Sequence, residues 1–182
     1  GTSSQRMVRL SRWLEVPFGE LDQIIEAALL AEHGVAGRGE AIGENTLRAL
    51  GLFRRLRRDY KVRAEDFAAL LNGVALYGRG IDRPQFDRVF NDPALFSEPL
   101  VLDDSPFSIV PANEAEYRRI LHLCGALGIG YETYLYVARY IVQSEADPEQ
   151  VALGEGEMLR WSHGVISTFY RLTRLAAWIG LT

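Results

Sequence analysis

The chain has few of the residues that most often carry chemistry. It contains one cysteine, Cys124, among its 182 residues, so no disulfide can form within it. Cys124 shares an apolar helical face with Ile120 and Leu127, and no basic residue close to it in the sequence would lower the pKa of its thiol. We therefore expect a core thiol and not a nucleophile.

Histidine is also scarce, and its spacing excludes the usual metal sites. None of the three histidines has a histidine four residues away or a cysteine pair nearby; they are His33, His122 and His163. We expect each to be a structural or surface imidazole. The sequence predicts no metal site.

The acidic and glycine-rich stretches do not follow catalytic patterns. Asp103 and Asp104, and likewise Glu155 and Glu157, lack the spacing of an EF-hand loop. No serine lies in a G-x-S-x-G elbow. Residues 34–43 contain four glycines, but an expected helix precedes them and their last spacing differs from the dinucleotide fingerprint. We expect no enzyme activity and no cofactor in this segment.

Long apolar runs and targeting signals are missing too. The strongly apolar runs are far shorter than the roughly 20 residues of a spanning helix, so we expect no direct membrane insertion by this segment. Residues 1–4 contain neither an initiator Met nor a signal-peptide pattern. We interpret Gly1 as a remnant of tag cleavage on a fragment excised from a longer chain.

Proline is concentrated in one part of the chain. Five of the seven prolines lie in residues 77–111, where helical periodicity is lost except in residues 84–90. We expect an ordered, mostly irregular insertion whose apolar residues fold back on the helices: Phe86, Phe90, Leu95, Phe96, Leu100, Leu102, Phe107 and Ile109. Residues 99–102 and 107–110 are candidates for a two-stranded hairpin.

The remaining sequence is dominated by helical patterns. Residues 47–71 predict a helix-turn-helix hairpin with a break at Val62 and an acidic first turn at Glu65 and Asp66. Further helices are expected at 20–32, 114–127, 131–144 and 155–179. The predicted fold class is all-α, with residues 1–182 forming a single helical module.

The apolar pattern of this hairpin occurs four times along the chain. Relative to anchors at Val16, Val62, Ile129 and Leu181, the residues nine, six and two positions earlier are apolar in every copy. They are Met7, Leu10, Leu14; Phe53, Leu56, Tyr60; Ile120, Leu123, Leu127; and Leu172, Leu175, Ile179. We predict a helical-repeat protein in which Leu10, Leu56, Leu123 and Leu175 are the innermost residues.

One face of the central hairpin is strongly basic. It carries Arg54, Arg55, Arg57, Arg58, Lys61 and Arg63. A phosphate track for nucleic acid would use such residues, but the net charge of −4 and the acidic residues that follow disfavour it. We interpret the cluster as a solvated helix face and expect no nucleic-acid partner.

Several aromatic and apolar residues are candidates for protein contacts. Tyr136 and Tyr140 are four residues apart and share a helical face that the repeat does not use. Trp178, Ile179 and Leu181 belong to the fourth copy, whose partner helix is not present. All five are predicted contact residues.

Three blocks of the chain resemble one known family. Residues 47–71, the run PQFDRVFNDPALFSEPLVLD at residues 84–103 and the run ILHLCGALGIGYETYLYVARYI at residues 120–141 are similar to the A component of bacterial Tc insecticidal toxin complexes and to related virulence-plasmid proteins. The part at 84–96 is the most specific, because any amphipathic repeat can imitate the helical copies.

The resemblance implies a structural role. It implies a segment of the α-helical shell around a translocation channel, in a large A subunit that assembles as a pentamer and is secreted or displayed on the cell surface. The implied partners are the remainder of the same subunit and its neighbouring subunits. A stand-alone helical-repeat adaptor that binds a protein partner is the alternative.

Overall fold

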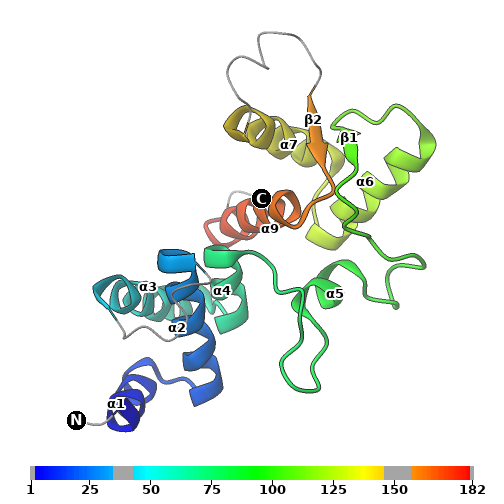
Figure 1. Ribbon diagram of the computed structural model, residues 1–182. Coiled ribbons are helices and arrows are strands. Elements are labelled where there is room, and N and C mark those ends of the chain that lie inside the picture. Colours follow the sequence, from blue (N-terminus) through cyan, green and yellow to red (C-terminus); the bar gives the residue numbers. More distant parts are fainter. Residues whose placement is uncertain (1–2, 35–42, 146–156, 181–182) are drawn as a thin grey trace. The chain divides into compact units, whose positions relative to one another are not determined.

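The computed structural model describes residues 3–34, 43–145 and 157–180 (Figure 1). Eight helices and one two-stranded sheet lie within these ranges, so the predicted all-α class is confirmed. The chain contacts divide it into two compact units, Gly1–Val74 and Ala75–Thr182. That all 182 residues form a single module stays a prediction.

The first unit is built from four helices around one apolar core. They are α1 (Ser3–Leu14), α2 (Phe18–His33), α3 (Glu44–Tyr60) and α4 (Ala64–Asn72). Leu21, Ile24, Leu50, Phe53 and Phe67 are almost completely buried, and the rings of Phe53 and Phe67 are 5.3 Å apart. Helix α2 packs against both α3 and α4.

The hairpin predicted at residues 47–71 is confirmed as α3 and α4. Helix α3 ends where Lys61 adopts a left-handed conformation, with φ 58° and ψ 30°, and its N–H bonds the carbonyl of Arg57 at 3.0 Å. Val62 then buries its side chain. The amide of Asn72 at the end of α4 donates to the carbonyl of Ala27 at 2.7 Å, which ties α4 to α2.

The second unit contains the other helices and the sheet. They are α5 (Gln85–Phe90), β1 (Pro106–Ser108), α6 (Glu114–Leu127), α7 (Tyr131–Glu145), β2 (Met158–Arg160) and α9 (His163–Trp178). Its core includes Tyr134, whose ring stacks on Phe169 at 5.6 Å and whose hydroxyl donates to the carbonyl of Ile109 at 3.2 Å. Burial raises the pKa of this hydroxyl.

The predicted hairpin between residues 99–102 and 107–110 is wrong. Strand β1 pairs instead with β2, antiparallel, with Phe107 opposite Leu159. Phe107 stacks on Trp161 at 4.1 Å, and the N–H of Trp161 donates to the carbonyl of Ser105 at 3.0 Å. The N–H of Leu100 is bonded to the side chain of Asn91 at 2.7 Å.

The last helix starts later than the sequence pattern predicted. Residues 158–160 are a strand, and α9 begins at His163. Ser162 caps it, because its hydroxyl accepts a hydrogen bond from the N–H of Val165 at 3.2 Å. Residues 155 and 156 lie outside the described residues.

The prediction that four equivalent leucines are the innermost residues is wrong in part. Leu123 is fully buried, but Leu10 and Leu56 are half-buried and Leu175 is 41% exposed. Helix α9 turns another face to the core, made of Val165, Ile166, Phe169, Tyr170 and Thr173. The fourth copy therefore does not follow the predicted inner face, whereas Ile120, Leu123 and Leu127 of the third copy do.

The Pro-rich insertion is mostly irregular, as predicted. Its only helix is α5, which agrees with the expected segment at 84–90, and most of its apolar side chains are buried or half-buried. Of the eight apolar residues expected to fold back on the helices, Leu95 does not, because it is 72% exposed; Tyr77, Ile81, Val101 and Val110 of the same segment are exposed as well.

Candidate functional site

The acidic residues that could have suggested a catalytic or cation-binding site have structural hydrogen bonds and ion pairs instead. Asp103 accepts hydrogen bonds from the hydroxyl and N–H of Ser105 at 2.6 and 3.1 Å and pairs with Arg119 at 3.3 Å. These bonds, those from Ser105 foremost, lower the pKa of Asp103 to about 2. Glu157 pairs with Arg139 at 3.5 Å, and Glu155 lies outside the described residues.

The three histidines have separate structural contacts. His33 lies 3.5 Å from the carboxylate of Glu32. The Nε2 atom of His122 is 2.6 Å from the carbonyl oxygen of Phe90, and its ring stacks on Phe96 at 3.9 Å. His163 lies on α9 with its Nε2 atom 3.2 Å from the hydroxyl of Ser167.

The contacts of the three histidines do not form a catalytic site among the residues that the structure describes. Ser167 is buried at 2% exposure, which leaves its hydroxyl without access to a substrate. Cys124 is a core thiol as predicted, and burial raises its pKa to about 11. Within the described residues no three His, Cys, Asp or Glu side chains gather closely enough to hold a metal ion.

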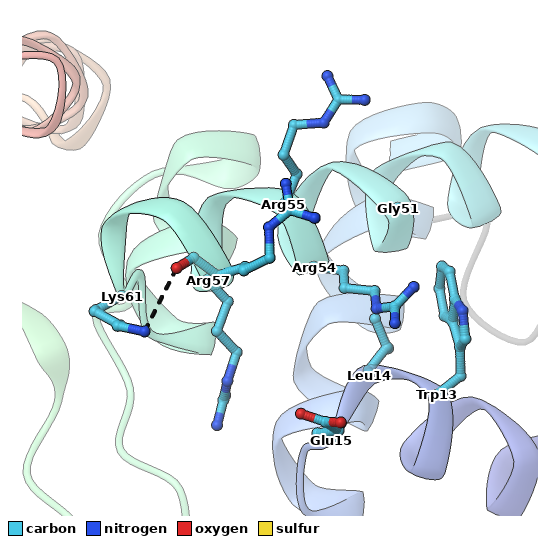
Figure 2. A pocket seen from close by; sticks show the side chains of 9 residues that line it. Trp13, Leu14, Glu15, Gly51, Arg54, Arg55, Arg57 and Lys61 are labelled. Carbon is cyan, nitrogen blue, oxygen red and sulfur yellow. Dashed lines mark hydrogen bonds between the residues drawn. The ribbon is translucent and has the colours of Figure 1, made fainter.

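The first unit contains a hollow of about 690 Å³, which we call the basic hollow (Figure 2). The end of α1 forms one wall, and α3 with the residue after it forms the other. The lining residues are Trp13, Leu14, Glu15, Gly51, Arg54, Arg55, Arg57, Arg58 and Lys61.

Two of its arginines are held by neighbouring carboxylates. Arg57 pairs with Glu20 of α2 at 2.8 Å, and Arg58 pairs with Asp59 at 2.7 Å. The bond from Arg58 is the first cause of the lowered pKa of Asp59, and the charges of Arg55 and Lys61 lower it further.

Three cations of the basic hollow have no such partner. The guanidinium of Arg54 lies over the indole ring of Trp13, 4.7 Å from its centroid. Lys61 donates to the backbone carbonyl of Arg58 at 3.5 Å. Neither of these residues, nor Arg55, forms an ion pair with any side chain in the described part of the chain.

The prediction that the arginine cluster of α3 is exposed to solvent is confirmed, but it did not include the wall opposite the cluster. Arg54, Arg55, Arg58, Lys61 and Arg63 are exposed, and Arg57 is half-buried. Sequence reasoning missed the opposite wall, because Trp13 at the end of α1 and Glu15 just after it lie about 40 residues earlier in the chain. The one local signal was that Trp13 is a large apolar residue outside the predicted inner set.

The predicted contact residues are mostly exposed. Tyr136 and Tyr140 on α7 are 79% and 56% exposed, Ile179 is 58% exposed and Trp178 is half-buried. Leu181 lies outside the described residues. Their role in protein contacts stays a prediction.

None of the described helices is both long and apolar enough to cross a bilayer. Comparison with known proteins is more informative about function. The chain is 32% identical over 177 residues, 97% of its length, to the toxin subunit YenA1 of Yersinia entomophaga. This chain is homologous to part of that toxin subunit.

The relationship to the A component of Tc toxin complexes, predicted from the three sequence blocks, is thereby confirmed. The chain spans 14% of the length of the relative, so it corresponds to a segment of it. No protein-family model matches the chain.

Proposed function

We propose that this chain is a structural segment of the α-helical shell of a large toxin-complex A subunit, and that the segment itself carries no catalysis. The observation that supports this most is the homology to a toxin subunit, which continues along 97% of the chain and therefore includes both compact units. A relationship that was confined to one short motif would give much weaker support.

The distribution of side chains is compatible with a structural role. In the first unit, Leu21, Ile24, Leu50, Phe53 and Phe67 form a core between helices. In the second, the aromatic stack of Tyr134 on Phe169 joins α7 to α9. Such tightly packed helices provide a rigid wall, which is what a shell around a channel requires.

The partners in this proposal are the rest of the same subunit and its neighbours in a pentamer, within a secreted or cell-surface complex. Tyr136, Tyr140, Trp178, Ile179 and Leu181 are the proposed contact residues. Tyrosine and tryptophan suit this role, because they bury a large area on contact while their polar atoms remain able to hydrogen-bond.

A stand-alone helical-repeat adaptor is the second candidate. The wide exposure of Tyr136 and Tyr140 on one helix favours it, because an adaptor needs an accessible surface for its partner. The two proposals differ in the size of the natural protein.

An antibody raised against this chain tests the choice. On an immunoblot of the producing organism, the shell proposal predicts a band several times heavier than the 20.4 kDa of this chain. A band near 20.4 kDa that co-purifies with another protein would replace the shell proposal with the adaptor.

A further inference from the structure

The basic hollow holds more positive charge than the surrounding carboxylates neutralise. Five cations line it, and Glu15 is the acidic residue among the lining side chains. Glu20 and Asp59 engage Arg57 and Arg58. Arg54, Arg55 and Lys61 are left without an ion pair in the described part of the chain. Because the lining cations outnumber the carboxylates that engage them, the hollow attracts an added anion.

The geometry also fixes one of these cations in advance. Figure 2 shows the side chain of Arg54 beside the ring of Trp13, and its guanidinium carbon is 4.7 Å from the ring centroid. This stacking uses the face of the guanidinium and leaves its N–H groups at the edge available to an acceptor. Because the arginine is held in place, less conformational entropy is lost when it binds a carboxylate.

The apolar residues of the lining indicate which chemical group lies next to the negative charge in the ligand. Trp13 is 44% exposed and supplies the apolar surface of this wall, because Leu14 beside it is buried at 2% exposure. Cations beside an exposed indole suit a ligand that carries carboxylates next to an apolar side chain. An acidic peptide with interspersed apolar residues has this chemistry.

A nucleic acid fits less well. A phosphate track of ordinary strength neutralises about 6 to 10 phosphates, whereas the basic hollow offers three unpaired cations. A short peptide with two or three carboxylates matches that number of cations better than a phosphate chain does.

We propose that the basic hollow binds an acidic peptide segment of a protein partner. Carboxylates of the segment pair with Arg54, Arg55 and Lys61, and a neighbouring apolar side chain packs on Trp13. This inference does not depend on the shell role, because a shell segment and an adaptor could each use the hollow.

The test measures binding of a short fluorescein-labelled peptide that alternates Asp with Leu to the whole chain, by fluorescence anisotropy at low salt. Saturable binding is expected. Arg54→Gln and Arg55→Gln should each weaken it about tenfold, because each removes one charge-assisted contact. Arg48→Gln is the matched control, since Arg48 lies on the same helix, is exposed and pairs with Glu44 outside the hollow.

Two further ligands separate the alternatives. A peptide with Asn in place of every Asp should not bind, and single-stranded DNA should bind more weakly than the acidic peptide. Circular dichroism melting of each variant verifies that it is folded. The proposal is overturned by no binding of the acidic peptide, by equal binding of the Asn peptide, by preferred binding of DNA, or by an equal loss in Arg48→Gln.

Discussion

At the scale of single residues, two glycines are under opposite constraints. A Cβ atom on Gly78 would lie 1.9 Å from the carbonyl oxygen of Asp82, so the turn can close only without a side chain. A Cβ atom on Gly51 of α3 would meet no atom within 4 Å. The surroundings therefore forbid alanine at one position and permit it at the other.

Gly78→Ala should lower the free energy of unfolding by about 1 to 3 kcal/mol, because the backbone of the turn must move. Gly51→Ala should raise it by about 0.5 to 1 kcal/mol, because alanine loses less conformational entropy in a helix. Urea denaturation of both variants measures the two changes. An unaltered midpoint for Gly78→Ala would mean that the turn is not formed as described.

The single cysteine provides a chemical test of the core. Because Cys124 is buried and its pKa is raised to about 11, its thiol should react with iodoacetamide far more slowly in the folded chain than in urea. Mass spectrometry follows the reaction without interference, since no other cysteine is present. Equal rates in the two states would show that the thiol is accessible.

The same pKa predicts a loss of stability at high pH. Below the ordinary pKa of 9.0 the thiol is neutral in both states and its burial costs no charge. As the pH rises from about 9 toward 11, the unfolded chain loses the proton while the folded chain keeps it, so the unfolded state gains stability. Cys124→Ala should reduce this pH dependence in thermal melts.

At the scale of helices, burial separates two leucines that the repeat pattern made equivalent. Leu123 of α6 is fully buried, whereas Leu175 of α9 is 41% exposed. Leu123→Ala should cost about 2 to 5 kcal/mol of unfolding free energy, and Leu175→Ala about 0.5 kcal/mol or less. Chemical denaturation of the two variants measures the difference, and similar costs at both positions would restore the predicted inner face of α9.

The sequence predicted the ends of a helix correctly where the residues that cap the helix are its immediate neighbours in the chain. Helix α6 has the predicted bounds, because Asn113 caps its start through the N–H of Glu116 at 2.9 Å and Gly128 ends it with φ 69°. Helix α7 starts at the predicted residue, Tyr131. Such capping contacts involve neighbours within one helical turn.

The failures involve partners that are distant in the sequence. Phe107 pairs with Leu159, and no pattern near either residue reveals the other. The start of α9 was missed because the segment before it is used as a strand partner. The basic hollow was seen in part for the same reason: its cations lie on one helix, but Trp13 comes from another.

At the scale of the whole molecule, the proposed contact face can be tested in the full-length subunit. The double variant Tyr136→Glu, Tyr140→Glu should weaken assembly, because it places charges where an interface would exclude water. Tyr77→Glu is a matched control, since Tyr77 is 86% exposed and lies outside the proposed contact set. Analytical ultracentrifugation measures the assembly, and equal behaviour of the double variant and the control would remove Tyr136 and Tyr140 from the interface.

The central claim is that this chain is part of the helical shell of a much longer toxin subunit. Electron cryo-microscopy of the intact natural protein tests it most directly, because the map locates residues 3–34, 43–145 and 157–180 within the assembly. The account predicts that these helices lie in the outer wall around a central channel, covered in part by other segments of the same chain. Particles in which these helices form a free-standing protein of about this size, with no wall and no channel, would contradict it.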